Sequence, residues 1–234
     1  MLEVKDIHTY YGMSHILQGV SISVKEGEII TLIGRNGAGK TTTLKSIIGL
    51  TPPKSGTITF QGEDITRMPT HLIAQKGIAY IPEERRILPN LTVEENLKLG
   101  MLKNRDRTKN NFLLERVFAY FPRLKERLRQ KGSSLSGGEQ QMLTMARGLV
   151  SGPAIMLIDE PTEGLMPSMV DQIARILVEM NRDGVTILLV EQNVEMALSI
   201  STHGYVIDQG MIQYRGNAED LRTNKEIQQR YLGV

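Results

Sequence analysis

The stretch that decides the fold is Ile29–Thr41, with the sequence IITLIGRNGAGKT. Its first five residues are apolar except for Thr31, as in a parallel strand that is buried on both faces of a sheet. A glycine-rich turn follows, and a helix is expected from near Gly39, with Leu44 and Ile47 at helical spacing. A strand, a glycine-rich turn and a helix in this order predict the first unit of an α/β fold.

The turn, Gly34–Thr41, matches the pattern G-x-x-x-x-G-K-[ST] of phosphate-binding loops and stands between a strand and a helix, as that pattern requires. Its glycines allow successive backbone N–H groups to face one anion, and the following helix adds its positive end. Lys40 can bind the β- and γ-phosphates, which also makes it a catalytic candidate, and the hydroxyl of Thr41 can bind Mg²⁺. The residues predicted to bind ATP here are Gly34, Arg35, Asn36, Gly37, Ala38, Gly39, Lys40, Thr41 and Thr42.

A second apolar strand ends in two carboxylates. Ile155–Ile158 is wholly apolar and is followed directly by Asp159 and Glu160. Because a buried charge is costly to desolvate, a buried strand that ends in two acids indicates a use for them. Asp159 is predicted to face the Mg²⁺ held at Thr41, and Glu160 is predicted to be the catalytic base that accepts a proton from the attacking water.

The rest of the chain predicts strands first, then helices, then both in alternation. Strands are expected at Leu2–Ile7, Ile16–Val24 and Thr57–Phe60, with helices in residues 90–131. After Gly137 the expected order is a helix (Glu139–Val150), a strand (Ile155–Ile158), a helix (Met169–Asn181), a strand (Thr186–Val190) and a helix (Val194–Ser199). Repeated β–α units indicate a parallel sheet with right-handed crossovers.

These elements predict a single α/β domain over residues 1–234, with the P-loop NTPase fold. Its RecA-like core, a parallel sheet with an N-terminal antiparallel β subdomain, is expected in residues 1–87 and 147–234. Residues 88–146 are expected to form an inserted α-helical subdomain that carries the second anion-binding loop described below. This region includes the basic stretch Lys103–Lys131, with ten Lys or Arg and three Asp or Glu. We interpret that stretch as a solvated helical face rather than a surface for lipid or a partner.

Composition excludes several classes of protein. The chain has 234 residues, of which 40% are hydrophobic and 23% charged, as is ordinary for a globular protein. The net charge of +2 does not indicate a nucleic-acid partner, and the absence of cysteine excludes disulfides and thiolate metal sites. There is no signal-peptide pattern and no apolar run near the length of about 20 residues that a membrane span needs. We therefore expect a soluble cytoplasmic protein, and any membrane role would have to come through a partner.

Leu135–Gln141, LSGGEQQ, predicts a second anion-binding loop. Ser136 and the N–H groups of two glycines open a helix near Glu139, so a helix dipole again points toward a phosphate. With the phosphate-binding loop before it and the acidic strand after it, this segment resembles the signature of ABC ATPases, and the resemblance covers essentially the whole chain. It implies that Ser136, Gly137, Gly138 and Glu139 bind the ATP held by a second subunit. The implied dimer is head-to-tail, and ATP closes it while hydrolysis opens it.

The resemblance also assigns roles to single residues. Tyr11 falls where the family stacks an aromatic ring on adenine. Glu83 stands where a Gln usually binds Mg²⁺, Gln192 where a His usually contacts the γ-phosphate, and Met166 where an Asp commonly crosses to the partner's site. Glu83 is still a suitable metal ligand, and Gln192 can still donate a catalytic hydrogen bond to phosphate, although it cannot become a cation. These departures indicate either a weakly active site or a subfamily, and we favour the subfamily.

Four segments together are similar to one of the two ATPases of branched-chain amino acid importers: PEERRILPNLTVEENL (Pro82–Leu97), LSGGEQQML (Leu135–Leu143), LLVEQN (Leu188–Asn193) and YLG (Tyr231–Gly233). The resemblance implies an ATP-hydrolysing subunit at the cytoplasmic face of the cell membrane. Its implied partners are a second ATPase subunit, identical or different, transmembrane permease subunits and, indirectly, a periplasmic or extracellular substrate-binding protein. Importers of urea or short amides and exporters of lipid or lipopolysaccharide are the alternatives, since the ATPase itself never contacts the cargo.

Overall fold

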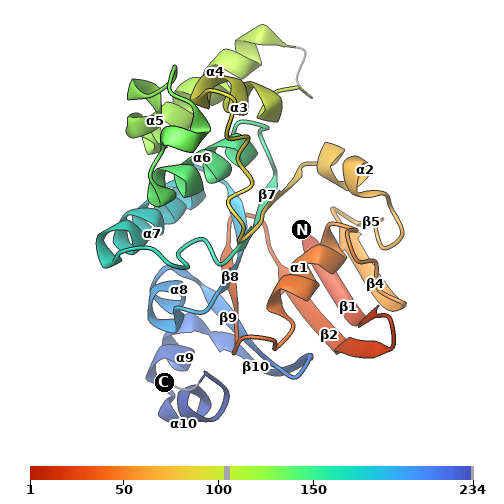
Figure 1. Ribbon diagram of the computed structural model, residues 1–234. Helices are drawn as coiled ribbons and strands as arrows, with labels where there is room; N and C mark the ends of the chain where they lie inside the picture. Colours follow the sequence, from red (N-terminus) through yellow and green to blue (C-terminus); the bar gives the residue numbers. More distant parts are fainter. Residues whose placement is uncertain (103–105, 233–234) are drawn as a thin grey trace.

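The computed structural model describes residues 1–102 and 106–232. Within them, the chain forms a central sheet, a second sheet packed beside it, and a helical lobe (Figure 1). Lys103 and Arg105 of the basic stretch, and Gly233 of the C-terminal YLG, lie outside the described residues.

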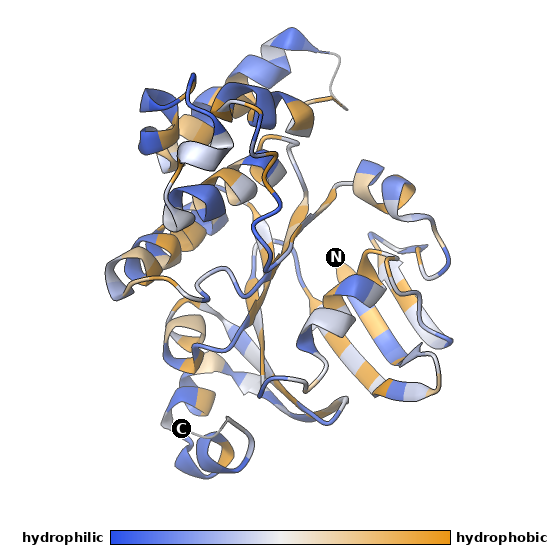
Figure 2. Ribbon diagram, viewed as in Figure 1, coloured by the Kyte–Doolittle hydropathy of each residue, from blue (hydrophilic) through white to orange (hydrophobic). Residues whose placement is uncertain are grey.

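The central sheet of the described chain has six strands in the order β10-β9-β3-β8-β7-β6. They are β3 (Ile29–Ile33), β6 (Ile78–Ile81), β7 (Ile155–Asp159), β8 (Thr186–Glu191), β9 (His203–Asp208) and β10 (Met211–Asn217). Neighbouring strands are parallel except for β10, which pairs antiparallel with β9 at the edge. β3, β7 and β8 are buried along their whole length, and Figure 2 shows this sheet as mainly hydrophobic. Because these strands are parallel and adjacent, their carboxyl ends meet at one edge of the sheet.

The second sheet is antiparallel, in the order β2-β1-β4-β5. Its strands are β1 (Leu2–Tyr11), β2 (Ser14–Val24), β4 (Ser55–Phe60) and β5 (Glu63–Asp64). Buried and exposed residues largely alternate along β2, because only one face of this sheet is covered. Helix α1 (Lys40–Ile47) joins the two sheets: its Leu44 is buried in one core with Leu2 of β1 and Ile30 of β3.

A second core lies on the other face of the central sheet. It is covered by α6 (Gly137–Leu149), α7 (Pro167–Arg182) and α8 (Val194–Ile200). Leu143, Leu177 and Ala197 of these helices are fully buried with Ile158 and Leu189 of the sheet. Since α6 starts with the signature segment and also belongs to this core, the position of that segment is fixed relative to the sheet.

The helical lobe extends from α6. It contains α3 (Val93–Gly100), α4 (Arg107–Tyr120), α5 (Pro122–Glu126) and a 3₁₀ turn (Gly132–Ser134). Leu113, Val117 and Phe118 of α4 are buried, and Pro122 is the first residue of α5, a position that suits proline. The remaining elements are α2 (Thr70–Gln75), α9 (Ala218–Thr223), α10 (Lys225–Ile227) and a π-helical turn (Gln228–Leu232).

The predicted fold class is confirmed: a parallel core sheet, an antiparallel β portion near the N-terminus and a helical insertion are all present. The sequence did not predict β6, β9 or β10: β6 has only four residues, and β10 has no fully buried residue. The division of the chain at residues 146 and 147 stays a prediction, and α6 runs across it. Among the described residues, none of the helices has the length and hydropathy that a membrane span requires.

Candidate nucleotide-binding site

The phosphate-binding loop connects the carboxyl end of β3 to α1, and close packing explains two of its glycines. A Cβ at Gly34 would collide with the carbonyl oxygen of Ile207 in β9. Gly39 has φ 113°, in the left-handed region that a residue with a side chain rarely adopts. These glycines let the loop turn tightly against β9, so its N–H groups converge above the start of α1.

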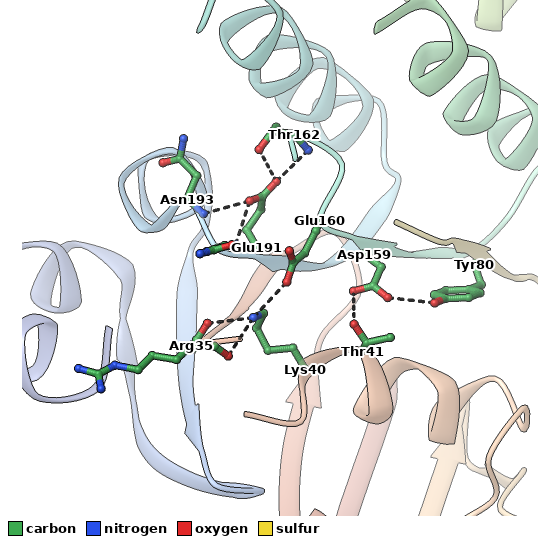
Figure 3. Close-up of polar contacts among 11 residues, drawn as sticks. Arg35, Lys40, Thr41, Tyr80, Asp159, Glu160, Thr162, Glu191 and Asn193 are labelled. Atoms are coloured by element: carbon green, nitrogen blue, oxygen red, sulfur yellow. Dashed lines mark hydrogen bonds and ion pairs between the residues drawn. The ribbon is translucent and has the colours of Figure 1, made fainter. Parts of the chain in front are cut away.

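Lys40 lies at the centre of this loop, with three acceptors around its ammonium group (Figure 3). Nζ donates to the carbonyl oxygens of Gly34 at 2.9 Å and Arg35 at 3.2 Å, and forms an ion pair with Glu160 Oε1 at 3.0 Å. The side chains of Lys40 and Glu160 are only 4% and 8% exposed. A phosphate that binds Lys40 competes directly with the carboxylate of Glu160, because both need the same ammonium group.

Glu160 is held by an unusual backbone conformation at the end of β7. Its φ is 42°, which is uncommon for a residue other than glycine, and its N–H donates to the carbonyl oxygen of Val190 in β8 at 2.9 Å. The turn directs the carboxylate toward the loop rather than along the strand (Figure 3). Backbone strain of this kind is found where a side chain must point in one direction for function.

Asp159 connects the sheet to the start of α1. Its Oδ1 accepts a hydrogen bond from Thr41 Oγ1 at 3.0 Å, and its Oδ2 accepts one from the hydroxyl of Tyr80 at 2.9 Å. Burial raises the pKa of Asp159, and the two hydrogen bonds counteract this effect. Burial and the neighbouring Asp159 raise the pKa of Tyr80 as well, so its hydroxyl remains a donor at neutral pH. The sequence alone does not indicate a role for Tyr80, because the role depends on the pairing of β6 with β7.

Glu83 lies at the entrance to the site, where it faces a second carboxyl group that the sequence did not predict. A hydrogen bond with Glu163, together with burial and the charges of Glu163, Glu160 and Asp159, raises the pKa of Glu83 to about 7. Thr41, Asp159 and Glu83 offer a hydroxyl and two carboxylates, which are the hard oxygen ligands that Mg²⁺ prefers. Thr41 and Asp159 are already in direct contact. The three side chains therefore fit a cation whose remaining ligands are phosphate and water oxygens. Among the described residues, no group of three or more His, Cys, Asp or Glu could hold a metal ion by itself.

A cavity of about 400 Å³ brings most of the predicted residues together. It is lined by Tyr11, Asn36, Gly37, Gly39, Lys40, Thr41, Thr42, Glu83 and Glu160, among others. Tyr11, at the end of β1, is 46% exposed and therefore available for stacking at the mouth of the cavity. Gly34 and Ala38 are buried beneath it, and the side chain of Arg35 points away from Lys40 (Figure 3).

Gln192 does not line this cavity. It lines a neighbouring cavity of about 730 Å³ between α7 and α8, which meets the first one at Glu160. The preceding Glu191, for which the sequence suggested no role, is buried and accepts hydrogen bonds from Thr162 and from the N–H groups of Gln192 and Asn193. Burial raises the pKa of Glu191, and these donors offset the shift. The turn after β8 is thus fixed by Glu191, with the side chain of Gln192 exposed.

The signature residues lie on α6, away from the 400 Å³ cavity of the same chain. Ser136 caps the helix: its Oγ accepts from Glu139 N–H at 3.4 Å, and Glu139 Oε2 accepts from Ser136 N–H at 2.9 Å. Glu139 also pairs with Arg127 Nε at 2.9 Å. Burial acts to raise the pKa of Glu139, but Ser136 and Arg127 together lower it below the ordinary value. Gly137 and Gly138 follow the cap, so this predicted anion-binding loop is preformed but faces outward from its own nucleotide cavity.

Comparison with known proteins places this arrangement in a family. The sequence profile described as "ABC transporter" matches residues 17–163. The chain is 43% identical over 233 residues to the high-affinity branched-chain amino acid transport ATP-binding protein BraG of Pseudomonas aeruginosa, with 100% of both chains covered. It is 33% identical over 240 residues to the lipopolysaccharide export system ATP-binding protein LptB of Escherichia coli, with 99% of this chain and 97% of LptB covered. The ADP conformation of MJ1267, an ATP-binding cassette of an ABC transporter, has a TM-score of 0.88 and 25% identity, with 98% of this chain and 97% of MJ1267 covered.

Proposed function

The chain belongs to the ABC transporter family as an ATP-binding subunit with ATPase activity, and on that premise we propose that it drives the import of branched-chain amino acids. The observation that carries the proposal is the full-length similarity, at 43% identity, to a protein named for high-affinity branched-chain amino acid transport. Glu83 and Gln192 support the same assignment, since the resemblance gives these residues to that subfamily. We place the working chain at the cytoplasmic face of the membrane, where its partners would anchor it.

In the proposed reaction, ATP binding breaks the ion pair between Lys40 and Glu160. When the phosphates of ATP occupy the loop, Lys40 binds them in place of the carboxylate 3.0 Å away. Glu160 is then free to accept a proton from the water that attacks the γ-phosphate, because its only ion-pair partner among the described residues is engaged elsewhere. The strained backbone of Glu160 keeps the carboxylate directed at the loop during this exchange.

Three residues are proposed to hold Mg²⁺: Thr41, Asp159 and Glu83. When bound, the ion would neutralise the negative charge that develops on the phosphates. The side chains prepare the site without it, because Tyr80 orients one oxygen of Asp159 while Thr41 contacts the other. Tyr11 is proposed to stack on the adenine ring, and Gln192 to approach the γ-phosphate once the neighbouring cavity closes.

ABC ATPase cassettes dimerise and work with transmembrane permease subunits. We propose a head-to-tail dimer in which the signature residues Ser136, Gly137, Gly138 and Glu139 of one chain complete the nucleotide site of the other. Support comes from the position of α6, whose signature segment faces away from the nucleotide cavity of its own chain. The second chain is either an identical copy or a different cassette of the same transporter.

A separate groove is proposed to receive the permease. It is a cavity of about 580 Å³ between α2 and β6 on one side and α3 and α6 on the other. Apolar side chains line it, and Leu50, Leu99 and Leu102 at its margin are exposed. Exposed leucines around a groove are typical of a protein–protein contact, and a short apolar helix of the permease is the occupant that the family membership supports.

Transport in a reconstituted system tests the cargo. The chain would be assembled in liposomes with the permease subunits and substrate-binding protein of its own transporter, and ATP-driven uptake of labelled leucine, isoleucine and valine would be measured. We expect uptake that is saturable and that unlabelled urea does not inhibit. Uptake of urea or a short amide without leucine uptake would contradict the proposal and support that alternative importer.

Lipopolysaccharide export is the second candidate, because LptB is similar over 97% of its length. It differs from the first in direction and in cargo. ATP-dependent extraction of lipopolysaccharide from the liposome membrane, with no uptake of amino acids, would favour this candidate over import.

A further inference from the structure

Arg85 lies against the first residue of the signature helix. It follows Glu83 by two residues, in the segment that leads from β6 toward α3. Its guanidinium is so close to Gly137 that a Cβ at position 137 would overlap with Nη1. Glycine at position 137 therefore leaves room for a charged group beside the N-terminus of α6.

The contact brings two positive groups together. The N-terminus of α6 carries the partial positive charge of its unpaired N–H groups. Ser136 Oγ accepts only from Glu139 N–H, and in the described part of the chain the N–H groups of Gly137 and Gly138 have no acceptor. A guanidinium next to these groups is unfavourable unless an anion lies between them.

The nearby carboxylates do not supply that anion. Glu84 pairs with Arg86 at 3.0 Å, and Glu139 is bound by Arg127 and by Ser136. Arg85 as a whole residue is partly buried, yet its guanidinium forms no hydrogen bond or ion pair with any described residue. A half-buried cation without a partner beside two free N–H groups points to an anionic ligand from outside the chain.

We propose that Arg85 binds, together with the N–H groups of Gly137 and Gly138, the terminal phosphates of the ATP that the facing subunit holds. The inference rests on the proposed dimer and deepens it by naming a residue of the signature site that lies outside the signature segment. A planar guanidinium suits this position, because two of its N–H groups can bind two oxygens of one phosphate. The segment 83–85 would then contact both nucleotides, since Glu83 faces the cation site of its own chain and Arg85 faces the partner's ATP.

The test separates binding of a chain's own ATP from closure of the dimer. Glu160→Gln is the background, because it is expected to keep ATP from being hydrolysed. Arg85→Gln, Arg85→Lys and the matched control Arg86→Gln are made in that background. Arg86 is the adjacent residue of the same segment, but its side chain is 60% exposed and paired with Glu84. Affinity for a fluorescent ATP analogue is measured at protein concentrations too low for dimerisation, and MgATP-driven association is measured by sedimentation velocity.

We expect Arg85→Gln to leave the affinity for the chain's own nucleotide within about twofold and to weaken association at least about tenfold, because charge-assisted contacts to phosphate are lost at both sites of the dimer. Arg85→Lys should recover part of the association, and Arg86→Gln should associate like the background chain. Equal thermal unfolding midpoints would show that the variants are folded. Association of Arg85→Gln equal to that of the background would overturn the role of Arg85 alone.

A background chain that stays monomeric is tested again with the second cassette of its transporter, with Arg85 changed only in this chain. A loss of association in that mixture supports the assignment, and unchanged association overturns it. If the background chain forms no ATP-dependent dimer with either partner, the proposed dimer itself is wrong and the inference fails with it.

Discussion

The phosphate-binding region and the signature region are both predicted to bind ATP, but they differ in how far one chain completes them. In the first, the charged groups are paired within the chain: Lys40 with Glu160, and Asp159 with Thr41 and Tyr80. In the second, Ser136 and the glycines after it are partly or wholly exposed and end in free N–H groups. We therefore expect the first region to bind nucleotide by itself and the second to need a ligand that another subunit brings. Variants in the two regions should separate nucleotide binding from dimer closure.

Glu160→Gln should have the largest effect. Removal of a general base typically costs about 10²- to 10⁴-fold in rate, so ATP turnover by the assembled transporter should fall by at least about 100-fold. Nucleotide binding should persist, because Lys40 keeps its charge and no carboxylate then competes with the phosphate for it. The measurements are steady-state phosphate release and sedimentation of the variant with MgATP, in which a closed dimer should accumulate. Turnover near the wild-type rate would show that another group takes the proton.

Lys40→Ala should affect the phosphate-binding region alone. Loss of charge-assisted contacts to phosphate is expected to weaken ATP binding by about 10- to 100-fold. The unfolding free energy should also fall by about 3 kcal/mol, because Glu160 is left buried without its partner. ATP titration and urea unfolding measure the two effects.

The double variant Lys40→Ala/Glu160→Gln is the control for this second effect. It lacks the buried carboxylate of Glu160, so it should recover much of the lost stability but none of the lost affinity. Unchanged ATP affinity in Lys40→Ala would refute the role of this lysine.

Ser136→Ala should give the opposite pattern. Loss of the N-cap is expected to cost about 1 kcal/mol of stability, while the affinity of the chain for its own ATP stays the same. ATP-dependent association should weaken, since the hydroxyl belongs to the proposed site for the partner's nucleotide. Ser133→Ala, at an exposed position in the preceding turn, is the matched control. A loss of ATP affinity in the monomer would contradict the separation of the two regions.

The same two regions show how much the sequence could predict. The loop Gly34–Thr41 and the acids Asp159 and Glu160 were predictable, because each depends on a local pattern at the end of a buried strand. Tyr80 was not, because its role arises only from the pairing of β6 with β7, in which Ile81 lies beside Ile158. A strand of only four residues, such as β6, is too short an apolar run to show which neighbour it will have.

Arg85 and Gln192 depend on contacts that a linear pattern does not contain. Arg85 gains its position from the space left by Gly137, which lies in a different segment of the chain. Gln192 was predicted beside the γ-phosphate from its motif. In this structure the carboxylate of Glu191 fixes the turn after β8 by accepting hydrogen bonds from the N–H groups of Gln192 and Asn193. Gln192 therefore lines the neighbouring cavity between α7 and α8. Its role at the phosphate stays a prediction, since the chain alone does not test it.

A substitution of Glu83 should have the smallest effect, and this effect appears in how ATP binding and stability depend on pH. Its pKa is raised to about 7 by the hydrogen bond with Glu163, by burial and by the surrounding carboxylates. Glu83 must lose its proton to bind Mg²⁺, so Mg²⁺-dependent ATP binding should weaken as pH falls through about 7, by at most about tenfold per unit of pH.

The stability of the chain without nucleotide should depend on pH in the opposite direction. The folded chain holds this proton more tightly than the unfolded chain, so unfolding free energy should fall as pH rises from the ordinary range of a glutamate toward 7. Glu83→Gln should remove the pH dependence of Mg²⁺-dependent binding and reduce that of unfolding, to which Asp159 and Glu191 also contribute through their raised pKa values. ATP titrations and unfolding curves between about pH 5 and 8 would measure both. If the variant kept the pH dependence of Mg²⁺-dependent binding, Glu83 would not be a ligand, and the phosphate-binding region would owe that dependence to another of its carboxylates.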